Sequence, residues 1–151
     1  MEECKVTICY NAGCGKDSPL VAGLVVAASL LLSNNIRRYA CADVVFGVPI
    51  GSRCLWYRLR ASGSRVKGFR MDERTVTGIM KRLLGEGRWP GTSISRIEMP
   101  TNHCEECVSV EVFLSQRKCP TCISLEPVEG LRFNAWWLAS AVMVVYDDWC
   151  T

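Results

Sequence analysis

The sequence predicts an α+β fold, arranged as a single small domain over residues 1–151. Alternating β-branched residues near 5–10 and 44–50 indicate strands. Between them, residues 20–32 are apolar on nearly every face of a helix, which is typical of a helix at the centre of a core. With 151 residues, of which 49% are hydrophobic and 22% charged, the chain is long enough for one core and too short for two large ones.

The first half of the chain is expected to begin with a strand at residues 5–10 and a Gly-rich turn. Ser18 then serves as the N-cap of the apolar helix, and Pro19 takes its first helical position, where a missing N–H is harmless. A second strand covers 44–50 and ends at a Pro and a Gly.

A hairpin is expected next, because residues 54–60 and 65–71 flank a turn at 61–64. Asp72 follows as the N-cap of an amphipathic helix, and Gly85 marks the end of that helix.

The last third is expected to contain a short strand at 94–99, ahead of a group of cysteines. Asn134 is a suitable cap for a helix over residues 135–146. The apolar run 142–146 is equally compatible with a buried strand, because periodicity does not separate the two in so short a segment.

The ten cysteines favour metal binding or burial rather than a disulfide framework. The chain opens with acidic Glu2 and Glu3, where a signal peptide needs a basic start and an apolar run. We therefore expect reduced thiols and a cytoplasmic location, which is the host cytoplasm if the protein is viral. The longest apolar run is shorter than the roughly twenty residues of a bilayer span, so no membrane partner is expected.

Two Cys-x-x-Cys pairs form the most specific pattern in the chain. Their members are Cys104, Cys107, Cys119 and Cys122. Two such pairs, eleven residues apart, supply the four thiolates that Zn²⁺ prefers in a closed structural site. Aliphatic residues at alternate positions 108, 110, 112 and 114 indicate a strand between the pairs. We therefore expect a zinc-ribbon-like substructure at 100–125 that holds one Zn²⁺ and performs no chemistry.

Other uses of these cysteines stay open. The two pairs can be redox pairs or disulfides, or they can hold an iron–sulfur cluster. His103 is able to replace one thiolate, but four sulfurs already complete the site, so a surface or supporting role is expected for it. The other six cysteines lack paired spacing and are expected to be buried small hydrophobes, unless some of them meet as a second site.

The segment 44–71 is basic and contains no acidic residue. In the expected hairpin, cations and aromatic rings lie together on strand faces, and such a face suits nucleic acid, RNA more than DNA. The residues concerned are Trp56, Arg58, Arg60, Arg65, Lys67 and Phe69. The alternative is an ordinary solvated strand face.

A phosphate-binding loop is the third pattern. Gly13, Gly15 and Lys16 lie between a strand and a helix, as in nucleotide hydrolases. Asp17 stands where that motif has a Ser or Thr, and Tyr10 stands where it has its first Gly, so the match is incomplete. No catalytic set is supported by the sequence, and we expect the protein not to be an enzyme.

A strand and an apolar helix, followed by cysteine knuckles in a small basic chain, resemble the zinc-binding silencing suppressors of plant RNA viruses, of the sobemovirus type. Cys104, Cys107, Cys119 and Cys122 carry the resemblance, although the spacing between their pairs is shorter here. It implies a non-enzymatic viral regulator that acts on RNA or on silencing proteins.

The sequence therefore predicts a non-catalytic zinc-binding protein with three kinds of partner: nucleic acid, a host protein, or a second copy in a homodimer. A diverged nucleotide-binding protein and a zinc-stabilised interaction module are the alternatives.

Overall fold

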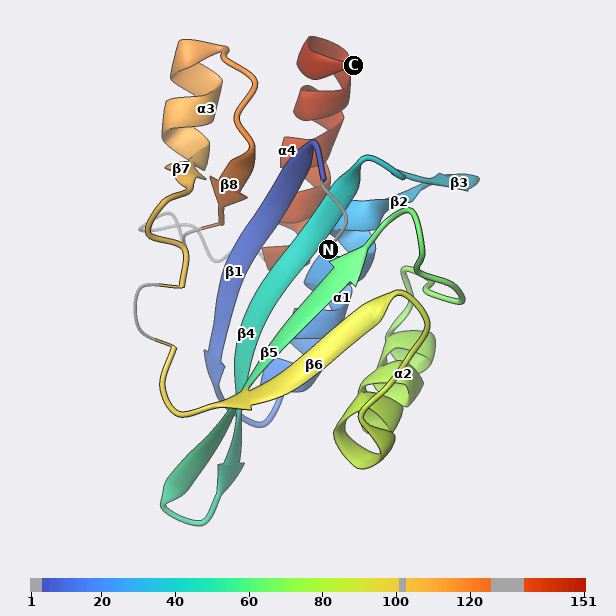
Figure 1. Ribbon diagram of the computed structural model, residues 1–151, viewed down its shortest axis with the longest axis vertical. Helices are drawn as coiled ribbons and strands as arrows, with labels where there is room; N and C mark the ends of the chain where they lie inside the picture. The colour runs from blue at the N-terminus through green and yellow to red at the C-terminus, as the bar shows by residue number, and fades with distance from the viewer. Residues whose placement is uncertain (1–3, 101–102, 126–134) are drawn as a thin grey trace.

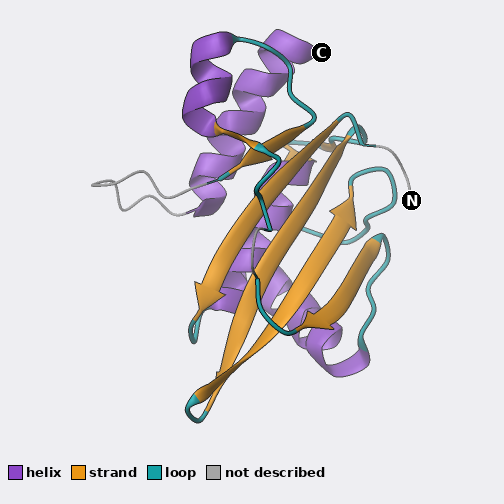
Figure 2. Ribbon diagram, turned by 60° about the vertical axis from the view of Figure 1, so that its left-hand side comes forward, coloured by secondary structure: helices purple, strands orange, loops and turns teal. Residues whose placement is uncertain are grey.

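The structure is a computed structural model that describes residues 4–100, 103–125 and 135–151. A six-stranded sheet in the order β6-β5-β4-β1-β8-β7 forms its centre, and helices pack against one face of it (Figure 1, Figure 2). Its strands are β1 (Val6–Cys14), β4 (Ala40–Ile50), β5 (Arg53–Ser62), β6 (Thr92–Ile97), β7 (Val108–Ser109) and β8 (Cys122–Ser124). Parallel pairs β1–β4, β1–β8 and β7–β8 combine with the antiparallel pairs β4–β5 and β5–β6. The α+β prediction is confirmed.

Helix α1 lies at the centre of the helical layer. It packs against β1 and β4 on one side and against α2 and α4 on the others (Figure 1). The helices are α1 (Ser18–Leu30), α2 (Glu73–Glu86), α3 (Val110–Gln116) and α4 (Ala135–Cys150). A short ribbon of β2 (Leu31–Leu32) and β3 (Asn35–Ile36) follows α1 and reverses the chain toward β4.

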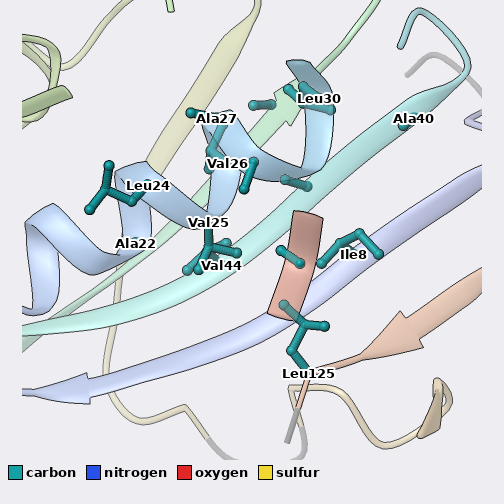
Figure 3. Close-up of a cluster of buried hydrophobic side chains, with 14 of the residues drawn as sticks. Ile8, Ala22, Leu24, Val25, Val26, Ala27, Leu30, Ala40, Val44 and Leu125 are labelled. Atoms are coloured by element: carbon teal, nitrogen blue, oxygen red, sulfur yellow. The ribbon is translucent and has the colours of Figure 1, made fainter. Parts of the chain in front are cut away.

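The core confirms the central position of the apolar helix. Val25 and Val26 of α1 are fully buried, together with Ile8 of β1 and Val44 of β4 (Figure 3). Each buried aliphatic side chain of this size contributes about 1.5–3 kcal/mol, so the contact between α1 and the sheet stabilises the fold substantially. The helix ends at Leu30, and the chain continues as strand from Leu31.

A buried arginine closes the C-terminal end of α1. The guanidinium of Arg37 is 3% exposed and donates to the carbonyl oxygens of Ala28 and Leu31, at 3.2 and 2.9 Å. It also donates to the Asp147 carboxylate of α4 at 2.9 Å. Carbonyls at a helix end have no partner within the helix, so one cation satisfies them and also attaches α4.

Helix α2 begins as the sequence predicts. The Asp72 carboxylate accepts from the Thr75 N–H at 2.7 Å. The helix continues past Gly85 and ends before Gly87, whose left-handed conformation (φ 77°) closes it. At Gly23 of α1 a Cβ would collide with Val76 of α2, so a glycine is required where the two helices touch.

The predicted hairpin of 54–60 with 65–71 is wrong. β5 pairs with β4 through a tight turn in which Gly51 has a φ of +60°, and its other edge pairs with β6 rather than with residues 65–71. After β5 the Val66 N–H bonds back to the Ser62 carbonyl, and residues 65–71 form no strand. Val66 and Phe69 are buried in the core. Burying these apolar side chains stabilises the fold more than exposing them on a two-stranded ribbon would.

The predicted strand at 108–115 is also wrong beyond its first residues. β7 covers only Val108–Ser109, and the Ser109 hydroxyl then caps α3 by accepting from the Val112 N–H. Val110 and Phe113 lie one helical turn apart and are both buried, with Phe113 against Tyr146 of α4. A zinc ribbon needs an extended segment here, and the structure has a helix.

The sequence leaves open whether the C-terminal apolar run 142–146 is helix or strand. It is helical and belongs to α4. The proposed cap Asn134 lies outside the described residues. Among the helices that the structure describes, none combines the length and apolar character that a membrane span requires.

All ten cysteines are described, and all are paired in disulfides, contrary to the expectation of reduced thiols. The pairs are Cys4–Cys41, Cys9–Cys104, Cys14–Cys54, Cys107–Cys122 and Cys119–Cys150. Stable disulfides belong to oxidising compartments, so this pairing counts against the expected cytoplasmic location.

Candidate functional site

Strand alternation builds a polar surface on the side of the sheet that α1 does not cover. Ile8, Val44 and Leu59 point toward the helices, so their neighbours in β1, β4 and β5 point the other way. We call this surface the helix-free face; Figure 1 views the sheet from this side. This face includes Thr7, Cys9, Asn11, Cys41, Asp43, Val45, Trp56, Arg58, Arg60, Ser93, Ser95 and Ile97, of which Cys9, Asp43 and Val45 are buried.

Asp43 is the centre of charge on the helix-free face. Arg58 donates to both of its carboxylate oxygens, at 2.9 and 2.6 Å, and the Nε of Arg60 lies 3.4 Å from one of them. The hydrogen bond to Asp43 is the main cause that raises the pKa of Arg58 above its ordinary value, and the charge of Asp43 adds to this while partial burial opposes it. Arg58, Arg60 and Asp43 therefore form one ion-paired cluster on this face.

The two arginines still reach solvent. The Asp43 side chain is only 10% exposed, whereas those of Arg58 and Arg60 are 37% and 42% exposed. Their guanidinium groups are therefore held in place by a buried carboxylate while remaining accessible to an anion in solution.

A cavity of about 800 Å³ adjoins this cluster, between β1, β4, β5, β6 and the segment before β8. Asp43 and Arg60 lie at its border, and Arg65 contributes a second arginine. The other polar side chains of its lining are the hydroxyl groups of Thr7, Ser62, Thr92, Ser93 and Thr121. Hydroxyls and arginines are common partners of phosphate oxygens, so this cavity suits an anionic group.

A disulfide lies at the end of the helix-free face that is close to the β4–β5 turn. Cys14 of β1 and Cys54 of β5 are bonded across β4, and a Cβ at Gly47 would collide with both. Gly47 is therefore the strand glycine that makes room for the crossing. Half-buried Trp56 is the cross-strand partner of Gly47 and lies next to this crossing.

The structure separates the six residues predicted to contact nucleic acid. Trp56, Arg58 and Arg60 do share the helix-free face of β5, and Arg65 lines the neighbouring cavity. Lys67 is exposed in the segment after β5, where its carbonyl accepts from the Trp89 indole rather than from a strand.

Phe69 is 7% exposed and belongs to the core, which corrects the expectation that it stacks on a base. Sequence reasoning missed Asp43 because it lies just before the acid-free segment. The signal that could have found it is the β4–β5 turn at Gly51, which sets Asp43 opposite Arg60.

The four predicted zinc ligands are not brought together. Cys104 pairs with Cys9, Cys119 pairs with Cys150, and only Cys107 and Cys122 pair with each other. A zinc ion held by all four would need another arrangement of these residues, and it stays a prediction. In the described part of the chain, the group with metal-ligand geometry is Cys9, His103 and Cys104.

The phosphate-loop pattern gains no support from this structure. β1 runs through Cys14, which is held in a disulfide, and only three residues separate it from α1. Asp17 is the N-cap residue of α1, so a carboxylate stands where a phosphate would bind.

Comparison with known proteins adds no relative: no family model matches the chain, and no curated protein is significantly similar to it.

Proposed function

We propose that this protein is a non-catalytic binding protein that holds single-stranded RNA on the helix-free face of its sheet. The observation that carries the proposal is the row of Trp56, Arg58 and Arg60 along β5, beside a hydroxyl-lined cavity that contains Arg65. Single strands are bound by faces that combine cations for phosphates with rings for bases. RNA is also the partner implied by the resemblance to silencing suppressors.

The arrangement favours a single strand over a duplex. A strand face that carries one ring and several cations gives an unpaired base a surface for stacking, whereas the bases of a duplex are already stacked. The hydroxyls of the cavity lie on four neighbouring segments and offer partners to a phosphate or a ribose without reading a sequence. We therefore expect little sequence preference.

The test is the salt dependence of binding to a fluorescent oligouridine, followed by anisotropy. Each phosphate contact contributes about 0.7 to the slope of log affinity against log salt for a single strand. Changing Arg60 and Arg65 to Gln should therefore flatten the slope by about 1.4. Lys81→Gln, an exposed charge change on α2 at the helical side, is the matched control and should leave the slope unchanged.

The aromatic contact has its own pair of variants. Trp56→Ala should weaken binding by about 1–3 kcal/mol, while Trp56→Phe should retain most of the affinity because it keeps a ring that can stack. Absence of binding at low salt by the folded protein would refute the proposal. So would a salt slope that is the same in the double variant and in Lys81→Gln.

A further inference from the structure

Three side chains with metal-binding atoms lie close together near Asp43, on the β1 side of the helix-free face. The RNA proposal makes no use of them. Cys9 of β1 meets His103 and Cys104 of the segment after β6, with one ligand atom from each lying within 4.8 Å of the others. Cys9 is 2% exposed and the His103 side chain 7% exposed, while Cys104 is half-buried, so the cluster lies at the edge of the protein interior.

The imidazole of His103 has a hydrogen-bond partner on β4. Its Nε2 lies 3.1 Å from the carbonyl oxygen of Asp43. When Nε2 carries the proton and donates to this carbonyl, Nδ1 has the lone pair that a metal binds. Histidines that bind metals commonly donate their other ring N–H to a carbonyl or a carboxylate in this way, which orients the ring.

We propose that Cys9, His103 and Cys104 bind one Zn²⁺ when the Cys9–Cys104 disulfide is reduced. Two thiolates and one imidazole are a ligand set that zinc favours, and water completes the tetrahedron. Bond lengths of about 2.3 Å to sulfur and 2.0–2.1 Å to nitrogen put the ligand atoms of such a site about 3.5–3.8 Å apart. In the disulfide form one ligand atom from each residue lies within 4.8 Å of the others and the two sulfurs are bonded, so after reduction the sulfurs must move apart to the separation that zinc needs.

The chemistry requires a reductant, which we take to be a dithiol. Its two thiols transfer two electrons and two protons to the Cys9–Cys104 bond, so the reductant becomes a disulfide and the protein gains two thiols. When Zn²⁺ binds, both thiols release their protons to solvent and the ion takes the two thiolates. Disulfide and metal are therefore alternative states of the same pair of sulfurs.

This site differs from the four-cysteine site that the sequence predicts. Both contain Cys104, but only the new site needs Cys9 and His103, and only the other needs Cys119. The two proposals can therefore be separated by single substitutions. Cys119 is exposed, so changing it to Ser is a mild control.

The experiment is a titration of the full chain with Co²⁺, after reduction by a phosphine that does not compete strongly for the metal. Wild type should develop the visible absorption of tetrahedral cobalt together with thiolate-to-metal charge transfer. His103→Gln should lower the affinity at least about tenfold, because even the loss of a partner that orients a ligand costs about 10–100-fold. Cys119→Ser should bind as wild type does, and peptide mapping should find Cys9 and Cys104 protected from alkylation by the metal.

Circular dichroism with each titration verifies that the variants share the wild-type secondary structure. Wild type that shows no cobalt–thiolate absorption after reduction would overturn the proposal. It would also be overturned if His103→Gln kept the wild-type affinity, or if Cys119→Ser lost as much affinity as His103→Gln does. The last result would favour the four-cysteine site.

Discussion

Asp43 is a largely buried carboxylate that forms ion pairs with Arg58 and Arg60 on the helix-free face. A carboxylate in this position orients the guanidiniums but also cancels part of their attraction for phosphate. If RNA binds here, Asp43 limits affinity while it preorganises Arg58 and Arg60.

Asp43→Asn should therefore change RNA affinity and folding stability in opposite directions. We expect the variant to bind oligouridine more tightly at low salt, because the face gains one net positive charge. It should lose about 1–3 kcal/mol of stability, because hydrogen bonds to a charged acceptor become weaker neutral ones. Asp148→Asn, the same charge change at an exposed site on α4, is the control for both measurements. Unchanged or weaker RNA binding by folded Asp43→Asn would contradict the proposed interface.

At the level of single elements, side-chain caps mark the start of α2 and α3. The Asp72 carboxylate bonds to the backbone N–H and the hydroxyl of Thr75, and these bonds lower the pKa of Asp72 below its ordinary value of 3.8. The Ser109 hydroxyl caps α3 by accepting from the Val112 N–H. The helix therefore begins inside a segment whose sequence pattern is typical of a strand.

Asp72→Ala should lower the unfolding temperature at neutral pH, because it leaves N–H groups of α2 without their partner. A carboxyl whose folded pKa is depressed adds stability above its unfolded pKa, and that stability is lost as the pH falls through the lower folded value. The difference in unfolding temperature between wild type and variant should therefore shrink as the pH falls below 3.8. Thermal unfolding followed by circular dichroism at several pH values measures this; a difference independent of pH would show that the charge is not involved.

Across the whole molecule, five disulfides connect parts of the chain that are far apart in sequence. The loops that they close range from 15 to 95 residues in separation. Closing loops of this size removes conformational freedom from the unfolded chain and contributes about 2–4 kcal/mol per bond.

Alkylation of the denatured but unreduced protein should therefore add no label, and alkylation after reduction should add ten. Reduction should also lower the unfolding temperature, since the unfolded chain regains its freedom. Intact mass and thermal unfolding measure these two outcomes. Ten labels without reductant would mean that the thiols are free, as a reducing compartment and the four-cysteine zinc site both require.

Features that depend only on neighbouring residues could be predicted from the sequence. The central helix α1, the cap at Asp72 and the strand at 44–50 follow from spacing and from local hydrogen bonds, so they can be recognised without the rest of the chain. Trp56, Arg58 and Arg60 were also placed together correctly, since alternation along one strand is a local property.

Which distant segments meet depends on how the whole chain packs, and the sequence pattern does not show it. β5 pairs with β4 on one edge and with the more distant β6 on the other, while Val66 and Phe69 of the segment after β5 are buried in the core. The same holds for the cysteines: the spacing of Cys104 and Cys107 is a local pattern, but their partners depend on which strands become neighbours. β1 brings Cys9 to Cys104, and β8 brings Cys122 to Cys107, because sheet order is set by the burial of whole strands rather than by the motif.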